Sequence, residues 1–239
     1  MEKYKVVIID DERLAREEVK RCLTNYPEFK IVGEAENASK GKQLIESENP
    51  HVVFLDIQMP EKSGFDLLDE LTTVPEIVFT TAYSEYAAKA FEVNALDYLV
   101  KPIREERFAK SINKLKEELF KTSQTRSEFL IHQKIFIKDR GKCYFIPLAD
   151  IRYIESLENY ARLHFKEDKA MVKKSLNTIE KKLDATVFFR INRKQIINIQ
   201  YIKKVYPHFN NRLKIVLNTD ETFDVSSRQS VRFKNWNSL

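Results

Sequence analysis

The chain has 239 residues, of which 43% are hydrophobic and 32% are charged, a composition that predicts a globular protein of one large or two ordinary domains. Its two cysteines, Cys22 and Cys143, are too few for a disulfide framework and lie too far apart for a zinc site, which favours a reducing, cytoplasmic setting. No apolar run approaches the ~20 residues of a membrane helix, and charged residues stand where a secretion signal would begin, so we expect no association with membranes.

The net charge of +5 conceals two halves of opposite sign. Residues 1–121 contain 18 Lys and Arg against 24 Asp and Glu, a net charge of −6, whereas residues 122–239 contain 23 against 12, a net charge of +11. This asymmetry predicts a module that binds a polyanion, joined to a module that does not.

Short β-rich runs alternate with amphipathic stretches in the first half. The expected strands are residues 5–10, 30–36, 52–57, 76–82 and 95–100, and the expected helices are 12–26, 38–49, 64–73, 84–94 and 104–120. Such an alternation indicates a parallel sheet with helices on both faces. We place the end of this domain at residue 121, after a last helix that closes near Phe120, and a polar linker at residues 122–130.

Acidic side chains follow two of these strands. Asp10 and Asp11 come at the end of the first strand, and Asp56 ends the third. Read alone, the acidic run at residues 10–12 is also typical of a helix start. If the first and third strands are neighbours, as in the flavodoxin-like strand order, the three carboxylates converge at the carboxyl edge of the sheet. Such a group of oxygen ligands suits Mg²⁺.

Two other strand ends carry complementary groups. Thr81 ends the fourth strand with a hydroxyl, and Lys101 follows the fifth strand with an ammonium group. A carboxylate, a bound cation, a hydroxyl and a lysine around one point form a receptor for a phosphoryl group. Asp56 would then be the nucleophile that becomes an aspartyl phosphate.

The segments VIIDDE, FLDIQMPEKSGFDLL, TTA and DYLVKPI resemble the receiver domain of two-component response regulators, over residues 3 to about 120. The resemblance implies a doubly wound, flavodoxin-like α/β fold with a five-stranded parallel sheet. It implies that Asp10, Asp11 and Asp56 bind Mg²⁺ together with the backbone carbonyl of Gln58. It also implies that a sensor histidine kinase phosphorylates Asp56.

The same resemblance assigns a switch to Thr81 and Tyr98. The Thr81 hydroxyl would move toward the phosphoryl group, and the Tyr98 ring would turn inward. We expect the rearranged receiver domains to form homodimers when they are phosphorylated.

The hydrophobic period changes in the second half. Residues 134–166 show several short strands with turns at residues 139–141 and 158–159, and residues 212–218 and 222–227 show a hairpin. Residues 172–184 have the apolar spacing of a helix. We therefore expect a mostly β domain at residues 131–239. Its predicted core includes Ile191, Ile196, Ile197 and Ile199.

Basic and amide side chains recur near the turns of this second domain. Lys and Arg attract phosphates, whereas Asn, Gln and Arg can also read base edges in the major groove. Any one of these residues is equally consistent with a solvated surface charge. Their number makes DNA the favoured ligand.

The segments ADIRYIESLENYARLHF, KSLNTIEKKL, FFRINRKQIINIQYIKKV and DVSSR resemble the LytTR-type DNA-binding domain, over about residues 131–239. The resemblance implies a β-rich fold whose loops enter successive major grooves of repeated sites in promoter DNA. The chain departs from the family at Asn192, often His, and at Ser227, where Arg commonly stands. The expected DNA contacts are Asn159, Tyr160, Arg162, Lys173, Lys174, Arg193, Lys194, Asn198 and Arg228.

Together these features predict a DNA-binding transcription regulator of a two-component system, and no enzyme activity. Two alternatives stay open. A Mg²⁺-dependent phosphohydrolase also forms an aspartyl phosphate, but its second Asp stands two residues after the first, whereas Asp10 and Asp11 are adjacent. A receiver-controlled regulator that binds RNA or an acidic protein would also use a basic second half.

Overall fold

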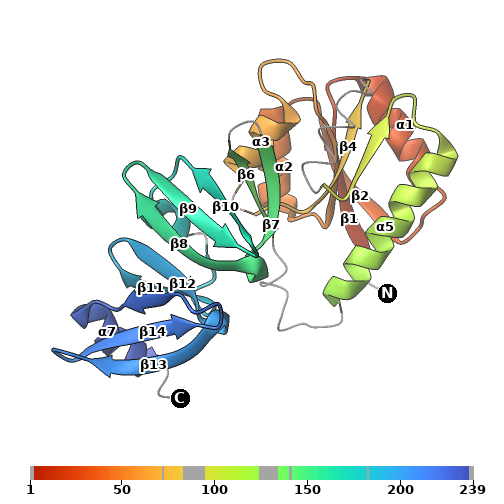
Figure 1. The fold of residues 1–239 in the computed structure, drawn as a ribbon. Helices are drawn as coiled ribbons and strands as arrows, with labels where there is room; N and C mark the ends of the chain where they lie inside the picture. The colour runs from red at the N-terminus through yellow and green to blue at the C-terminus, as the bar shows by residue number, and fades with distance from the viewer. Residues whose placement is uncertain are drawn as a thin grey trace. The chain divides into compact units, whose positions relative to one another are not determined.

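The structure is a computed structural model that describes residues 3–71, 73–82, 95–123, 134–139, 142–181 and 183–236. The chain divides into two compact units, Met1–Phe145 and Ile146–Leu239 (Figure 1). None of the helices in these described ranges is long and apolar enough to cross a membrane.

A parallel five-stranded sheet lies at the centre of the described part of the first unit. Its strands are β1 (Tyr4–Ile9), β2 (Phe29–Ala35), β3 (Val52–Asp56), β4 (Glu76–Thr81) and β5 (Asp97–Val100), in the order β2-β1-β3-β4-β5. The first and third strands are therefore neighbours, with Ile9 beside Leu55. The predicted flavodoxin-like sheet is confirmed.

Helices cover both faces of this sheet because successive strand residues point to opposite sides. They are α1 (Arg13–Leu23), α2 (Ala38–Glu48), α3 (Gly64–Glu70) and α5 (Glu105–Ser123). α1 and α5 share a buried cluster with Val6 and Ile8 of β1, whereas α2 and α3 share another with Val7 and Ile9. The helix predicted at residues 84–94 lies outside the described residues.

The last helix of the first half is longer than predicted. α5 continues to Ser123, past its predicted end near Phe120, so the predicted linker begins inside the helix. The rest of that linker, residues 124–130, lies outside the described residues. The domain limits at residues 121 and 131 stay predictions.

A hairpin follows, made of β6 (Lys134–Asp139) and β7 (Lys142–Pro147). The sequence assigns it to the second domain, but residues up to Phe145 belong to the first compact unit. Phe136, Cys143 and Phe145 are buried in the same cluster as residues of α2, α3 and β4. Figure 1 shows the hairpin beside α3.

The second unit is mostly β, as predicted. A five-stranded antiparallel sheet has the order β10-β9-β8-β12-β11, and a three-stranded sheet has the order β13-β14-β15. The elements are β8 (Ile151–Leu157), β9 (Tyr160–Phe165), β10 (Asp168–Val172), α6 (Leu176–Glu180), β11 (Phe188–Asn192), β12 (Gln195–Asn198), β13 (Ile202–His208), β14 (Arg212–Leu217), β15 (Thr222–Asp224) and α7 (Ser227–Trp236), with short 3₁₀ turns at Leu148–Asp150 and Ile199–Tyr201. Of the predicted core residues, Ile191, Ile196 and Ile197 are buried, and Ile199 is partly buried.

Three elements of this unit differ from the sequence prediction. α6 ends at Glu180, so the helix predicted over residues 172–184 is mostly not helical. β13 was not predicted, because most of its residues are exposed and its sequence lacks polar–apolar alternation. α7 was read as a basic turn segment, because its buried face is formed by few residues, Ser230 and Phe233 among them.

Candidate functional site

The three acidic residues converge at the carboxyl edge of the parallel sheet. Asp10 directly follows β1, and Asp56 is the last residue of the neighbouring β3. Carboxylate oxygens of Asp10, Asp11 and Asp56 all lie within 4.8 Å of one another. We call these three residues the carboxylate cluster. Asp10 and Asp56 are only 2% and 4% exposed, so their mutual repulsion is weakly screened by water.

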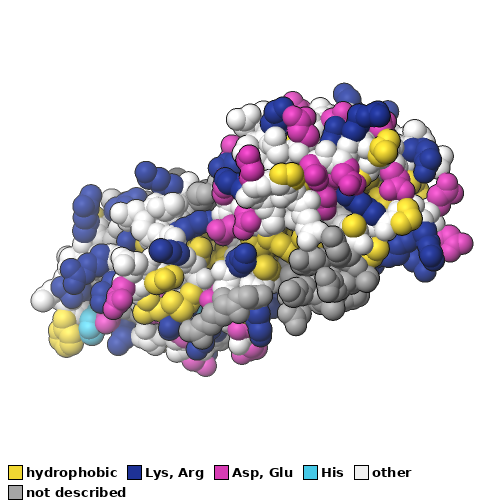
Figure 2. All heavy atoms as spheres, turned by 90° about the horizontal axis from the view of Figure 1, so that it is seen from above, with side chains coloured by type: hydrophobic (Ala, Val, Ile, Leu, Met, Phe, Trp, Pro, Cys, Tyr) yellow, Lys and Arg dark blue, Asp and Glu magenta, His cyan; other side chains and the backbone are white. Residues whose placement is uncertain are grey.

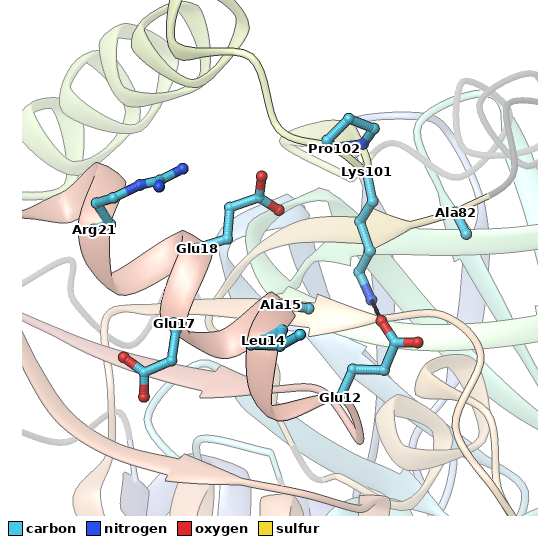
Figure 3. Close-up of a pocket in the computed structure, with 9 residues that line it drawn as sticks. All are labelled: Glu12, Leu14, Ala15, Glu17, Glu18, Arg21, Ala82, Lys101 and Pro102. Atoms are coloured by element: carbon cyan, nitrogen blue, oxygen red, sulfur yellow. Dashed lines mark ion pairs between the residues drawn. The ribbon is translucent and has the colours of Figure 1, made fainter.

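Lys101 provides the positive charge at this cluster. Its Nζ lies 2.8 Å from Asp10 Oδ2 and 3.1 Å from Asp56 Oδ2, and its side chain is 13% exposed. Glu12 Oε2 is farther away, at 3.8 Å, and Figure 3 shows this ion pair as a dashed line. Lys101 therefore bridges the two buried carboxylates and fixes their relative position.

Burial prevails in the pKa shifts of the two carboxylates of the site but not in that of Lys101. It raises the pKa of Asp10, against the lowering effect of Lys101. It also raises the pKa of Asp56, and the charge of Asp10 adds to that increase. Burial alone would lower the pKa of Lys101, but the hydrogen bond to Asp10 and the charges of both carboxylates outweigh it and raise that pKa.

The donor set of the cluster fits a hard cation. Carboxylate oxygens are the ligands that Mg²⁺ takes in proteins, usually with several waters retained. One ammonium group faces three carboxylates, so a bound divalent cation would relieve the remaining repulsion. The residues that would hold it are Asp10, Asp11 and Asp56. A role for the Gln58 carbonyl stays a prediction.

Hydrogen bonds orient the two buried carboxylates. Asp56 Oδ1 accepts from the Gln58 N–H at 3.1 Å, and Asp10 Oδ1 accepts from the Glu12 N–H at 3.0 Å. The Thr80 hydroxyl donates to Asp10 Oδ2 at 3.5 Å, and Thr80 is the strand partner of Asp56. The sequence reasoning missed Thr80, although its place beside Thr81 at a strand end was a usable signal.

Gly64 is a second residue that the sequence reasoning missed. A Cβ atom at this position would lie 2.3 Å from the backbone carbonyl oxygen of Asp56. The Gly64 N–H also donates to the Ile57 carbonyl at 2.9 Å, which holds the start of α3 against the end of β3. Only glycine permits this approach behind the phosphoacceptor candidate.

The two predicted switch residues lie inside the fold. Thr81 ends β4, is fully buried, and accepts at its carbonyl from the Lys101 N–H at 2.8 Å. Tyr98 on β5 is 8% exposed and belongs to the buried cluster that includes Phe79. Tyr98 pairs with Phe79 of the neighbouring strand, and the switch role and movement of both residues stay predictions.

A hollow of about 710 Å³ opens beside Lys101. Figure 3 shows its lining by α1 on one side and by Lys101, Pro102 and Ala82 on the other. Glu18 of α1 accepts from the Ile103 N–H at 3.1 Å, which ties the two sides together. Leu14, on the same helix, is 73% exposed. The hollow therefore joins an exposed apolar side chain to the charged site.

Several predicted DNA contacts meet at one end of the five-stranded sheet. The β8–β9 turn is at this end, since Leu157 pairs with Tyr160. β10 ends there too, since Val172 pairs with Ala161, so Lys173 and Lys174 continue beside that turn. We call this end of the sheet the contact end. Asn159 and Tyr160 are exposed on it.

The β11–β12 turn lies at the contact end as well. The Ser156 N–H donates to the Lys194 carbonyl at 2.7 Å, which places this turn next to the end of β8. Arg193 and Lys194 are both exposed there. On the face drawn in Figure 2, the second unit shows more Lys and Arg side chains than Asp and Glu side chains. The contact end therefore presents positive charge on adjacent turns.

Arg190 holds the β11–β12 turn in shape, a role that the sequence reasoning missed. Its Nε donates to the Asn192 carbonyl at 2.8 Å and its NH2 donates to the Arg193 carbonyl at 2.7 Å. Its NH1 donates to Glu180 at 2.9 Å. The side chain is 12% exposed, and its planar fork suits several acceptors at once. Arg190 is a positioning residue for Arg193.

The start of α7 approaches the same turn. Asn192 Nδ2 donates to the Asp224 carbonyl at 3.1 Å, and the Ser226 N–H donates to the Ile191 carbonyl at 3.0 Å. Arg228 is exposed in the first turn of α7, so the prediction that a loop carries it is wrong. Its position beside the turn still suits the predicted contact.

One predicted DNA contact is contradicted by its burial. Asn198 is fully buried, its Nδ2 donates to the Ile151 carbonyl at 3.0 Å, and its Oδ1 accepts from the Gln200 N–H at 3.0 Å. It also lies at the far end of β12 from the contact end. Asn198 therefore stabilises the fold. Arg162 lies on β9, half-buried, with its NH1 3.4 Å from Glu155.

Two known families match successive parts of the chain. The family described as "Response regulator receiver domain" matches residues 6–113, and the family described as "LytTr DNA-binding domain" matches residues 141–238. The first match contains the carboxylate cluster and Lys101, and the second contains the contact end.

Curated relatives align over nearly the whole chain. The sensory transduction protein LytT of Enterococcus faecalis is 34% identical over 96% of this chain and 97% of its own length. The transcriptional regulatory protein BtsR of Escherichia coli is 34% identical over 94% of this chain and 95% of its own length. Among solved structures, the REC domain of AraT, a response regulator from Geobacillus stearothermophilus, aligns with 51% of this chain and 98% of its own, at 30% identity and a TM-score of 0.46.

Proposed function

The chain belongs to the response regulators that join a receiver domain to a LytTR DNA-binding domain, and from this membership we propose that phosphorylation of Asp56 controls its binding to repeated promoter sites. The observation that carries the proposal is the buried contact of Lys101 with both Asp10 and Asp56, 2.8 and 3.1 Å away. Asp56 can carry a phosphoryl group on its carboxylate, and the ammonium group of Lys101 is placed to neutralise the oxygens of that group.

The proposed transfer starts from a phosphohistidine of a sensor kinase. A carboxylate oxygen of Asp56 attacks the phosphorus, the O–P bond forms, and the N–P bond to the histidine breaks. Lys101 stabilises the negative charge on the transferred oxygens, and Asp10 holds Lys101 in place. Mg²⁺ bound by the carboxylate cluster would supply further charge neutralisation.

The hollow beside Lys101 supports a docking site for that kinase. Leu14 is 73% exposed at its rim and offers an apolar anchor. We expect Leu14→Ala to slow phosphotransfer from the kinase about tenfold, because a lost apolar anchor costs about 1–2 kcal/mol. Phosphorylation by acetyl phosphate, which needs no docking, should stay unchanged. Equal slowing with both donors would contradict this role of Leu14.

The contact end supports the DNA half of the proposal. Segments 158–160, 173–174 and 193–194 meet there, and Arg228 lies on α7, whose start contacts the β11–β12 turn. Adjacent basic turns of this kind can enter a major groove and contact the flanking phosphates. Phosphorylated chains would pair as homodimers, so that two DNA-binding units reach repeated sites at raised effective concentration.

The experiment that tests the function uses the full chain with acetyl phosphate and Mg²⁺. Intact mass should show one added phosphoryl group, which Asp56→Asn removes. Selection from genomic duplex fragments should enrich repeat-containing sites more strongly with acetyl phosphate, and light scattering should show a doubled mass. Phosphorylation at another residue, or preferential binding to single-stranded RNA, would overturn the proposal.

A further inference from the structure

The β6–β7 hairpin buries aromatic side chains within the first unit. Phe136 and Phe145 are 5% and 6% exposed, and their ring centroids lie 5.2 Å apart. The Phe136 ring lies 6.3 Å from that of Phe65 in α3, and the Phe145 ring lies 6.4 Å from that of Phe79 in β4. Aromatic pairs at such distances attract each other beyond the area that they bury. The hairpin is therefore part of the core of this unit.

Charged and backbone contacts fix the hairpin at two points. Lys134 Nζ lies 2.8 Å from both carboxylate oxygens of Glu76, and the two side chains are 17% and 14% exposed. The Val74 N–H donates to the Lys134 carbonyl at 3.0 Å. At the other end of β6, Lys138 Nζ lies 3.7 Å from Asp66 of α3. The Lys134–Glu76 pair is shielded from solvent, so it fixes the position of β6 better than a surface pair would.

Phe65 and Phe79, the ring partners of the hairpin, each lie next in sequence to a residue that contacts Asp56 or pairs with it. Phe65 follows Gly64, whose backbone is in tight contact with the Asp56 carbonyl. Phe79 precedes Thr80, the strand partner of Asp56. A shift at Asp56 or at the end of β4 can therefore reach the rings of Phe65 and Phe79, against which the hairpin packs. Tyr98 belongs to the same buried cluster as Phe136 and Phe145.

We infer that the β6–β7 hairpin relays the phosphorylation state of Asp56 to the DNA-binding unit. β7 runs from Lys142 to Pro147, so one continuous strand leads from the core of the first unit past Phe145 into the second. The inference rests on the proposed function and adds the element that couples its two sites. Packed cores respond to small shifts by changing between discrete arrangements, which suits a relay.

The first test follows the hairpin itself in the unmodified sequence. Hydrogen exchange of the full chain is measured with and without acetyl phosphate and Mg²⁺. We expect the exchange rates of amides in residues 134–139 and 142–146 to change on phosphorylation, and Asp56→Asn to abolish the change. Unaltered exchange in this hairpin, at full phosphorylation of Asp56, would overturn the inference.

The second test breaks and restores the Lys134–Glu76 pair. Lys134→Glu and Glu76→Lys each remove it, and the double variant restores an ion pair of reversed polarity, in which the new carboxylate also faces Glu118 of α5, 3.7 Å from Lys134 Nζ in the wild type. Lys142→Glu makes the same charge change at an exposed position of the hairpin and is the matched control. For each variant, affinity for a selected DNA site is measured with and without acetyl phosphate. The fraction of phosphorylated chains is measured in parallel.

We expect phosphorylation to strengthen DNA binding of the wild type about fivefold or more, a common size of coupling between two sites. The two single variants should lose this strengthening at unchanged phosphorylation. Lys142→Glu should keep it, and the double variant should regain part of it, because Glu118 repels the new carboxylate at position 134. Wild-type strengthening in both single variants would overturn the relay. If the phosphorylated wild type binds DNA no more strongly than the unphosphorylated wild type, the proposed function is refuted, and the relay with it. If a single variant fails to unfold cooperatively, hydrogen exchange of the wild type decides.

Discussion

Lys101 and Gly64 show how single residues shape the surroundings of Asp56, the proposed phosphoacceptor, from opposite sides. Lys101 Nζ lies 3.1 Å from the Asp56 carboxylate, whereas Gly64 leaves room beside the Asp56 backbone carbonyl because it has no side chain. The first contact depends on charge and the second on the absence of a side chain. Substitutions at these two positions therefore test different properties of one site.

Gly64→Ala should damage the site without a change in charge. The added methyl group would meet backbone, which cannot rotate away, so we expect about 1–3 kcal/mol lower stability and slower phosphorylation. Urea unfolding and the rate of phosphoryl accumulation from acetyl phosphate measure both effects. Gly33→Ala is the control, because its Cβ would meet the flexible end of Leu44 at 2.8 Å. Equal effects of both variants would contradict a specific role of Gly64.

Arg190→Lys tests the positioning of the β11–β12 turn. Lysine keeps the charge but cannot bind the Asn192 and Arg193 carbonyls and Glu180 together, so specific DNA affinity should fall about tenfold, or about 1.4 kcal/mol. Affinity for random DNA should change little, because it depends on charge. Arg232→Lys makes the same substitution at an exposed position. A similar loss with Arg232→Lys would contradict the positioning role.

At the scale of elements, β5 and α5 are joined by a buried carboxylate. Arg107 NH1 and NH2 lie 2.6 and 2.7 Å from the oxygens of Asp97, Lys114 Nζ lies 2.9 Å away, and the Ser111 hydroxyl also donates to it. Burial alone would raise the pKa of Asp97, but these donors outweigh it and hold the pKa well below its usual range. The ionised form is therefore stabilised by folding.

This pKa shift predicts how stability depends on pH. Asp97→Asn should lower the free energy of unfolding at pH 7 by about 2–4 kcal/mol, less than a fully buried pair would lose, because Arg107 and Lys114 are partly exposed. The stabilisation is present above the pKa of the unfolded chain, about 4, and is lost as the pH falls toward the folded pKa. The difference between wild type and variant should thus shrink in acid.

Urea unfolding between pH 7 and pH 3 measures this difference. Glu46→Gln, at an exposed position of α2, provides a control for loss of a negative charge. A difference that is constant across this range would contradict the ionic contribution of Asp97.

Elements with a regular hydrophobic period were predictable from the sequence. The five parallel strands and the convergence of Asp10, Asp11 and Asp56 followed from periodicity and from the carboxyl-edge rule. β13 and α7 were not predictable, because too few of their residues are buried to give a regular spacing of hydrophobic residues. Gly64 and Arg190 were missed for a different reason, since their roles depend on backbone atoms of other segments. Asn198 was misassigned because burial cannot be read from an amide in a basic stretch.

At the scale of the whole molecule, the basic half predicts salt-dependent DNA binding. The logarithm of affinity should fall linearly with the logarithm of salt concentration, and Lys194→Ala should reduce the slope by about 0.9 if Lys194 contacts one phosphate. Titrations at several salt concentrations measure the slope. Lys40→Ala, on α2 of the first unit, should leave it unchanged. An unchanged slope for Lys194→Ala would remove this residue from the phosphate contacts.

The exposed strand β13 bears on how copies of the chain can stand side by side on DNA. β13 is an edge of its sheet, and such an edge can recruit a strand from a neighbouring molecule and start aggregation. Pro207 lacks the N–H that such pairing needs, and Lys204 would bring like charges together. If the chain binds repeated sites as proposed, neighbouring copies would therefore stay separate at this edge and could dissociate from the DNA one at a time.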